Sequence, residues 1–282
     1  MRIVALLALR NEELYLERCI RHLVEQGVEI CIIDNESTDR SRDIAQSYLG
    51  KGVFQIVDQP FHGHFDLLGQ LQIKERLAAT IDADWFIHHD ADEIRQAPDP
   101  NQTLAQAIRI VDTQGYNAIN FHEFTFIPTS LDEQFEKSDY VAQMHYYYFF
   151  SPNPNHRVNA WKKLSIQANL TDSKGHQVRF PGRKLSPVPF VLRHYIFLSA
   201  MQGLQKYGGR YFSKFEVEQL GWQRSNRQNW GQGELILPSR DSMKRLTALK
   251  AKLDNSDPQP KHLFSFTGAG RKDLAGAADR PT

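Results

Sequence analysis

The sequence predicts an α/β protein built on a mostly parallel central sheet with helices on both faces. Uninterrupted apolar runs such as RIVALLAL (2–9) and EICIID (29–34) are typical of strands buried on both faces. Helical periodicity separates these runs, and strand–helix alternation indicates parallel pairing with right-handed crossovers. The composition, 41% hydrophobic and 24% charged over 282 residues, is that of an ordinary soluble globular protein.

The charge balance argues against a nucleic-acid polymer as the partner. Lys and Arg together number 34 against 33 Asp and Glu, so no strong overall field attracts polyanions. The two cysteines, Cys19 and Cys31, lack metal-ligand spacing and fit a reducing, cytoplasmic compartment. The N-terminal apolar run stops at Arg10, too soon for a signal peptide or a membrane span. We expect no transmembrane segment, with peripheral membrane association left open.

The first hundred residues alternate regularly between strand and helix. Four strands are expected at 2–9, 29–34, 53–58 and 83–90, and three helices over 11–27, 37–50 and 67–80. Asn11 is placed to cap the first helix, and Ser37 or Thr38 the second, because such side chains accept the orphan N–H groups of a helix start.

The rest of the chain is less regular. It predicts helices at 101–115, 199–207 and 241–253, a strand at 116–126, and short strands within QVRF and VPFVLRHYIF. The aromatic-rich stretch Tyr140–Trp161 is interpreted as core, with stacking on acceptor sugars as the alternative. We divide one domain into halves at 1–115 and 116–254, followed by a tail, 255–282, expected to be disordered.

Polar residues follow three of the predicted strands. They are Arg10-Asn11-Glu12, Asp34-Asn35 and Asp90-Ala91-Asp92. In open parallel sheets ligands bind outside the carboxyl ends of the strands, so these groups predict a small-molecule site. Asp90 and Asp92 point the same way in an extended stretch and suit Mg²⁺ or Mn²⁺; a solvated loop is the alternative.

Two residues of this edge have simpler explanations. Asn11 could act only as a helix cap, and Glu12 suits the positive end of a helix. Since Ser37 and Thr38 already supply cap groups, Asp34 is expected to be free to accept hydrogen bonds from a ligand.

Three segments in order, ALRNEE, IIDNESTDRS and ADWFIHHDADE, resemble the family 2 glycosyltransferases. Asn11-Glu12 matches the first motif of that family, the run Ile32–Asp39 matches the second, and Asp90 with Asp92 matches its Asp-x-Asp metal motif. The resemblance covers about residues 1–100 and implies the GT-A fold, a nucleotide-sugar-binding α/β domain.

The resemblance implies a role for each matched position. Residues from Ala8 to Asn11, with Glu12 beside them, would line the nucleotide base, and Arg10 would stack on it. Asp34 would hydrogen-bond the base, Asp92 would bind Mn²⁺ or Mg²⁺, and Asp90 would support the ribose or the metal. The implied reaction moves a sugar from a nucleoside-diphosphate sugar, commonly UDP-linked, to a saccharide or glycolipid acceptor, as in polysaccharide biosynthesis.

The later segment HYIFLSAMQGLQKYGGR resembles the His-Tyr…Ser…Lys stretch of some of these enzymes. His194 would be a third metal ligand or a phosphate contact, with Lys206 and Arg210 as counter-charges. The alternative for His194 is a partly buried histidine held by a backbone carbonyl. Of His88 and His89, at least one is expected to face a helix and to be structural.

An inverting transfer needs a carboxylate to take the proton of the acceptor hydroxyl. The candidates are Glu123, Asp139 and Asp172, and Glu123 is preferred because we expect it at a strand end on the same sheet edge. Two alternatives stay open: a nucleotidyltransferase, although RNEEL is neither glycine-rich nor basic, and a non-catalytic nucleotide- or glycan-binding homologue. A P-loop enzyme is disfavoured because no G-x-x-x-x-G-K-[ST] motif occurs.

Overall fold

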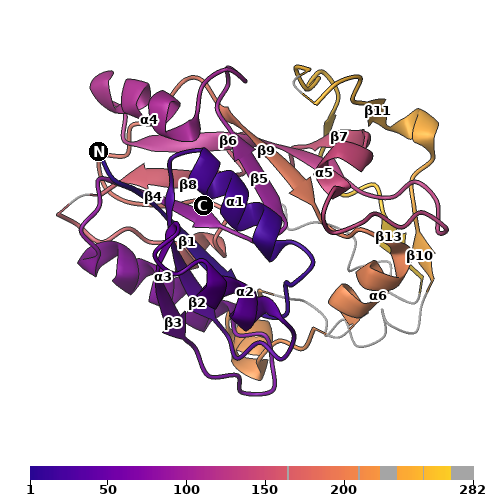
Figure 1. The fold of residues 1–282 in the computed structure, drawn as a ribbon, viewed down its shortest axis with the longest axis horizontal. Helices are drawn as coiled ribbons and strands as arrows, with labels where there is room; N and C mark the ends of the chain where they lie inside the picture. Colours follow the sequence, from indigo (N-terminus) through magenta and orange to yellow (C-terminus); the bar gives the residue numbers. More distant parts are fainter. Residues whose placement is uncertain (164, 209, 223–233, 250, 268–282) are drawn as a thin grey trace. The chain divides into compact units, whose positions relative to one another are not determined.

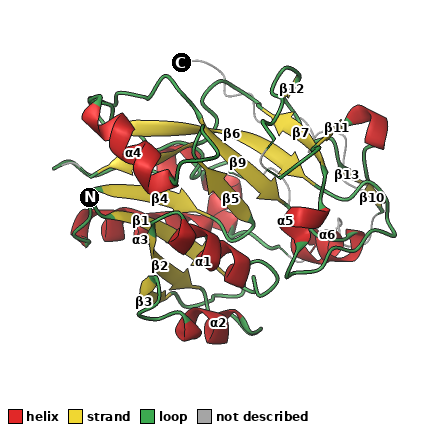
Figure 2. Ribbon diagram, turned by 45° about the horizontal axis from the view of Figure 1, so that its top comes forward, coloured by secondary structure: helices red, strands yellow, loops and turns green. Residues whose placement is uncertain are grey.

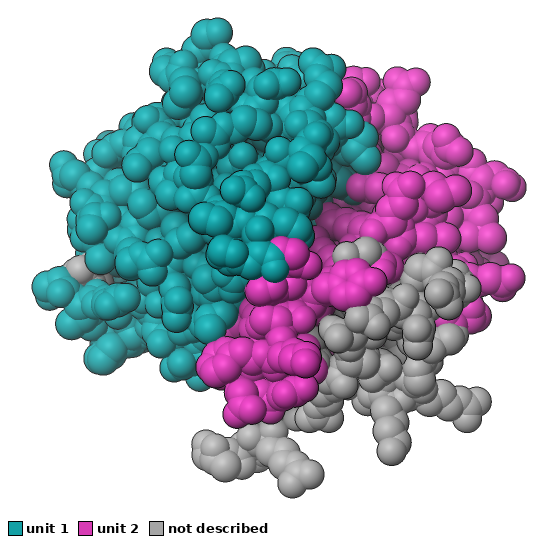
Figure 3. Space-filling model, turned by 90° about the horizontal axis from the view of Figure 1, so that it is seen from below, with its two compact units in different colours: residues 1–62, 66–122, 155–192 teal, residues 63–65, 123–154, 193–282 magenta. Residues whose placement is uncertain are grey.

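The computed structural model describes residues 1–163, 165–208, 210–222, 234–249 and 251–267. The chain divides into two compact units (Figure 3). Unit 1 comprises residues 1–62, 66–122 and 155–192, and unit 2 comprises residues 63–65, 123–154 and 193–282. The division therefore differs from the predicted one at residue 115, because 155–192 returns to the first unit.

Unit 1 is built on four parallel strands in the order β3-β2-β1-β4 (Figure 1). Their bounds are β1 Ile3–Leu9, β2 Glu29–Asp34, β3 Val53–Asp58 and β4 Trp85–His89. The side chains of β1, β2 and β4 are almost wholly buried, as their continuous apolar runs predict. All four predicted strands are confirmed.

Beyond β4 the pairing within unit 1 becomes antiparallel. β8 (Val158–Lys162) pairs with β4, and the first residues of β6 (Ala118–Phe126) pair with β8. A short strand, β5 (Glu93–Gln96), follows the acidic cluster. The α/β class is thus confirmed, with a sheet that is parallel through its N-terminal strands and mixed as a whole.

Helices flank this sheet (Figure 2). Their bounds are α1 Leu16–Glu25, α2 Ser41–Ser47, α3 Leu67–Thr80 and α4 Leu104–Thr113. His88 contacts Lys74 of α3, whereas His89 lies beside Cys19 of α1. Successive strand residues point to opposite faces, so α1 and α3 cover opposite faces of the sheet. The expectation that at least one of the two histidines faces a helix is confirmed for both.

The starts of two helices differ from prediction. α1 begins at Leu16, not after Asn11, and α2 begins at Ser41, not after Ser37 or Thr38. Neither helix has a side-chain cap, because the polar residues expected to cap them bond elsewhere: Asn11 bonds Thr38 of the next loop, and Ser37 bonds Asp34 within its own loop. In contrast, α4 begins with a reciprocal capping box between Thr103 and Gln106.

Unit 2 combines short strands with an aromatic core. The last four residues of β6 pair with β7 (Tyr146–Phe150), which also pairs with β11 (Lys244–Arg245) and β12 (Pro258–Gln259). The remaining elements are α5 Tyr140–Gln143, the end of β9 (Phe190–Tyr195), α6 Ala200–Gly208, a π-helical turn Phe215–Gln219, β10 Leu235–Ile236, a 3₁₀ turn Arg240–Ser242 and β13 Ser265–Phe266. Most of the aromatic side chains of β7 are buried, which confirms the core interpretation of that stretch.

Three expectations for the second half are wrong or need correction. The described residues 241–249 and 251–253 do not form a helix, because Lys244 and Arg245 pair with β7 and their strand pairing overrides the helical spacing of the leucines. Residues 255–267 are not a loose tail: Phe264 and Phe266 are buried in the unit 2 core. The rest of the predicted tail, 268–282, lies outside the described residues. QVRF makes only isolated bridges, whereas the expected helix at 199–207 is confirmed as α6.

Candidate functional site

The site residues of unit 1 lie at the carboxyl ends of its parallel strands. In the strand register Leu9 is opposite Asp34, and Leu7 is opposite His89, the last residue of β4. Asp90 therefore follows β4 at the same edge at which Asp34 ends β2. This is the edge at which open parallel sheets bind their ligands.

The three carboxylates after β4 have different environments. The Asp90 side chain is 48% exposed, whereas Asp92 is 7% and Glu93 1% exposed. Glu93 Oε2 accepts a 2.6 Å bond from Arg95 and a longer one from the backbone N–H of Asp90. Glu93 thus fixes the turn after β4, which leaves Asp90 and Asp92 as the carboxylates suited to a ligand.

Two buried cations accompany these carboxylates, and the sequence analysis missed both. Arg95 is fully buried, pairs with Glu93, and lies with its guanidinium 4.4 Å from the ring centroid of Phe121. Lys74 of α3 is 1% exposed, with Nζ 3.9 Å from Asp90 Oδ1. One signal was available, since Lys74 shares the apolar stripe of Leu71 and Ala78 on α3.

Burial and charge shift the titration of these groups. Burial lowers the pKa of Lys74 to about 8, with the Asp90 carboxylate opposing that shift. Burial alone would raise the pKa of Asp90, but the Lys74 ammonium, together with His88 and Arg157, outweighs it and holds that pKa well below its ordinary value. Burial, followed by the nearby cations, lowers the pKa of His88 and His89, so both imidazoles are neutral near pH 7.

Asn11 joins the first motif to the second. Its backbone has a φ of 56°, and its Oδ1 accepts a 2.7 Å bond from the backbone N–H of Thr38. The backbone N–H of Glu12 donates to Ser41 Oγ at 2.8 Å. The two loops thus brace each other, and the cap-only explanation of Asn11 is wrong because α1 begins five residues later.

Asp34 is not free, contrary to the sequence expectation. It is 4% exposed, its Oδ1 accepts a 2.6 Å bond from Ser37 Oγ, and its Oδ2 lies 3.4 Å from Arg42. Ser37 bonds Asp34 rather than capping α2, which is why the carboxylate already has partners within its own loop. Any contact of Asp34 with a base would add to these bonds.

Arg10 forms a stacked pair with Phe61. Its guanidinium carbon lies 3.4 Å from the ring centroid of Phe61, and the guanidinium donates to the carbonyls of Asn35 and Glu36. These bonds hold the guanidinium plane in place, and Ala8, two residues earlier in β1, is half-buried. Phe61 was not a predicted site residue, because an aromatic in a loop gives no periodic signal.

Unit 2 brings together two residues that the sequence places 71 positions apart. His194 Nδ1 lies 2.6 Å from Glu123 Oε1, and the Glu123 side chain is fully buried whereas that of His194 is 14% exposed. Glu123 lies inside β6, opposite Phe150, and not at a strand end as expected, because β6 continues to Phe126. The other candidate bases, Asp139 and Asp172, are exposed.

Lys206 and Arg210 also belong to unit 2. Lys206 lies in the last turn of α6, and the Arg210 guanidinium packs 4.9 Å from the ring centroid of Phe65 and 5.9 Å from that of Tyr207. Both side chains are half-buried. Their predicted contact with phosphate stays a prediction.

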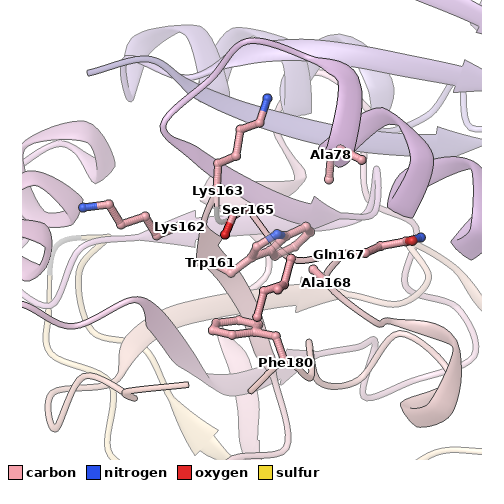
Figure 4. Close-up of a pocket in the computed structure, with 10 residues that line it drawn as sticks. Ala78, Trp161, Lys162, Lys163, Ser165, Gln167, Ala168 and Phe180 are labelled. Atoms are coloured by element: carbon pink, nitrogen blue, oxygen red, sulfur yellow. The ribbon is translucent and has the colours of Figure 1, made fainter. Parts of the chain in front are cut away.

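A cavity of about 190 Å³ lies elsewhere in unit 1 (Figure 4). Trp161 and Phe180 line it, beside the residues that follow β8. Lys162 pairs with Asp112, and Lys163 donates to a backbone carbonyl, so both ammonium groups at its rim are engaged. Lys162 is in register with Trp85, the first residue of β4, which places this cavity at the end of β4 opposite to the acidic cluster.

The acidic side chains after β4 offer few donors for a metal ion. No group of three or more His, Cys, Asp or Glu side chains among them is arranged to hold a metal. Asp90 and Asp92 nonetheless fit a hard divalent cation, because Mg²⁺ commonly takes only one or two carboxylates and completes its shell with water and substrate phosphates. Asp90 is open enough to take such a ligand.

Comparison with known proteins identifies the N-terminal region. The sequence model described as "Glycosyl transferase family 2" matches residues 5–94, the part that holds all three motifs. Residues 5–94 of this chain thus match the family 2 glycosyltransferases. The match confirms the resemblance, and the strand order confirms the α/β fold class.

Solved structures similar to this chain include three of S. aureus TarS. TarS shows 12% identity and a TM-score of 0.44 over 70% of this chain, and TarS 1-349 shows 11% identity and a TM-score of 0.44 over 69%. TarS 1-349 in complex with UDP-GlcNAc shows 10% identity and a TM-score of 0.41 over 74% of this chain. The matches cover 37%, 60% and 65% of those chains, so this chain spans less than two thirds of each. No curated protein matches the sequence.

Within the part of the chain that the structure describes, no helix is both long enough and apolar enough to cross a membrane.

Proposed function

We propose that this protein transfers a sugar from a nucleoside-diphosphate sugar, with UDP as the nucleotide, to a saccharide or glycolipid acceptor. The observation that carries the proposal is the convergence of the three family motifs, all within residues 5–94, on the carboxyl edge of one parallel sheet. Position at this edge and family membership support the same type of ligand. We also propose a cytoplasmic location, which the two buried free cysteines support.

The nucleotide would bind over the first two motifs. The Arg10–Phe61 stack offers a planar cationic surface suited to a nucleobase, and Ala8 is proposed to line the same base. Asn11, Glu12 and Asp34 would act mainly through the loops that they hold together, with Asp34 adding a hydrogen bond to the base.

Asp92 and Asp90 would hold a Mn²⁺ or Mg²⁺ ion. When bound, such an ion supplies Lewis-acid stabilisation of the departing nucleoside diphosphate. Asp92 is the better anchor because its burial fixes the carboxylate, whereas the more exposed Asp90 can also meet the ribose. Lys206 and Arg210 are proposed as further partners of the diphosphate.

The acceptor proton would be taken in unit 2 by the Glu123–His194 pair. Because Glu123 is fully buried, the more exposed His194 would meet the acceptor hydroxyl, and Glu123 would orient the imidazole and stabilise its protonated form. A carboxylate-bound histidine is also typical of metal ligands, the role that the resemblance gives to His194. Loss of Mn²⁺ binding in His194→Ala would favour the metal role.

Calorimetric titration of UDP with and without Mn²⁺, combined with UDP release from UDP-sugars, tests the proposal. We expect Mn²⁺-dependent UDP binding in the wild type, and Asp92→Ala should abolish both that binding and turnover because the anchoring carboxylate is lost. Asp99→Ala, which removes an exposed carboxylate from the loop before α4, is the matched control and should change neither. Unaltered Mn²⁺-dependent binding in Asp92→Ala would contradict the metal assignment.

A further inference from the structure

We propose that Lys74 is a positioning residue, a fixed internal counter-ion of Asp90 that makes metal binding at Asp90 and Asp92 depend on the diphosphate of the nucleotide. The inference rests on the proposed function, because it takes donor and metal to meet at these two carboxylates. It adds a residue that belongs to none of the three motifs.

The ammonium group of Lys74 is held in place. Its side chain is 2% exposed, and Nζ lies 3.1 Å from His88 Nδ1, 3.2 Å from the carbonyl of His89 and 3.9 Å from Asp90 Oδ1. Two acceptors thus lie within hydrogen-bond distance of the ammonium, and the Asp90 carboxylate lies at ion-pair distance. Because breaking a buried ion pair is costly, we expect the Lys74 ammonium to stay in place when a second cation binds.

The histidine that holds Lys74 is itself confined. Gly175 has a φ of +81°, and a Cβ atom built on it would lie 3.2 Å from both Cε1 and Nε2 of His88. The loop backbone therefore packs closely over the imidazole. Confinement of His88 fixes its Nδ1, and with it the position of the Lys74 ammonium below Asp90.

The charges around the acidic cluster nearly cancel without any ligand. Asp90, Asp92 and Glu93 carry three negative charges, whereas Lys74 and Arg95 carry two positive charges. Arg157 adds a weaker positive influence on Asp90. A divalent cation alone would leave this partly buried site with excess positive charge, which is costly at low effective dielectric constant.

A nucleoside diphosphate removes that excess, because its phosphate oxygens bring negative charge and complete the coordination shell. Lys74 thereby couples the two ligands: the metal binds poorly alone and well together with the diphosphate. Removal of the Lys74 charge should release the metal from this dependence.

Calorimetric titration of MnCl₂ at neutral pH, with and without saturating UDP, tests the inference. The wild type should bind Mn²⁺ at least about tenfold more tightly with UDP present. Lys74→Met keeps the length of the side chain without its charge, and should bind Mn²⁺ alone about tenfold more tightly than the wild type. Arg76→Met, which removes an exposed charge from the same helix, should behave like the wild type.

Equal or weaker Mn²⁺ affinity in Lys74→Met would overturn the inference, as would a wild type whose Mn²⁺ affinity does not depend on UDP. The wild-type measurement needs no variant, and Lys74→Gln provides a second neutral side chain if Lys74→Met does not fold. A purely structural role of Lys74 would lower the melting temperature without raising Mn²⁺ affinity.

Asp92→Ala separates this inference from the proposed function. If Asp92→Ala abolishes Mn²⁺ binding while Lys74→Met shows no gain, the site stands and only the role of Lys74 fails. If Asp92→Ala leaves Mn²⁺ and UDP binding unchanged, the proposed site itself fails.

Discussion

Glu93 in unit 1 and Glu123 in unit 2 are both buried carboxylates, but their partners differ. Glu93 pairs with Arg95, a permanent cation that is fully buried, so no proton can be exchanged and no ligand reaches the pair. Glu123 pairs with His194, whose imidazole, unlike a guanidinium, can exchange a proton, and whose side chain keeps 14% of its surface exposed. The partner, more than the burial, decides whether a buried carboxylate stabilises the fold or serves chemistry.

The largest effect is expected at Glu123. Glu123→Gln keeps the shape of the side chain but removes the charge that orients and stabilises the His194 imidazole. We expect kcat to fall about 10²- to 10⁴-fold, the usual range for loss of general acid–base catalysis, with a nearly unchanged melting temperature.

Turnover measured with a UDP-sugar and a saccharide acceptor checks this prediction. Glu133→Gln, at a half-buried carboxylate of the same unit that pairs with Arg240, is the control and should keep full activity. A wild-type kcat in Glu123→Gln would contradict a catalytic role of Glu123 and leave it, like Glu93, a structural carboxylate.

The opposite behaviour is expected at Arg95. Arg95→Met leaves Glu93 buried without its partner, which should lower the free energy of unfolding by about 3–5 kcal/mol. Chemical denaturation monitored by circular dichroism measures this loss. The double variant Arg95→Met/Glu93→Gln should recover part of the stability because the uncompensated charge is gone. If the single variant loses less than about 1 kcal/mol in the free energy of unfolding, the Glu93–Arg95 pair does not stabilise the fold as claimed.

The smallest effect concerns the Arg10–Phe61 stack. Phe61→Ala removes the ring that supports the guanidinium and should weaken UDP binding about tenfold, in line with one stacking contact. Phe54→Ala is the matched control, since Phe54 stacks with Arg2, near the start of β1 and away from the site. If both variants bind UDP with equal affinity, the Arg10–Phe61 stack does not take part in nucleotide binding.

The parallel half of unit 1 could be predicted because each of its signals is local. The apolar runs at 2–9 and 29–34 have no polar interruption, and the order of strands and helices restricts the topology. The position of Asp34, Asp90 and Asp92 at one edge of the sheet could be predicted from where the apolar runs end.

The remaining features depend on contacts between distant segments. Lys74 reaches the acidic cluster only because α3 packs on the face of β4 that carries His88. Lys244 and Arg245 leave the helical pattern because β7 offers them a strand partner. Ser37 bonds Asp34 instead of capping α2. Both arrangements suit a serine in this loop, so its sequence position does not decide between them.

The most direct test of the central claim is a crystal of the wild-type protein soaked with UDP and MnCl₂, with diffraction recorded at an energy at which manganese scatters anomalously. The account predicts an anomalous peak beside the carboxylates of Asp92 and Asp90, in contact with the diphosphate of UDP. UDP bound elsewhere, or a manganese peak remote from Asp92, would contradict it.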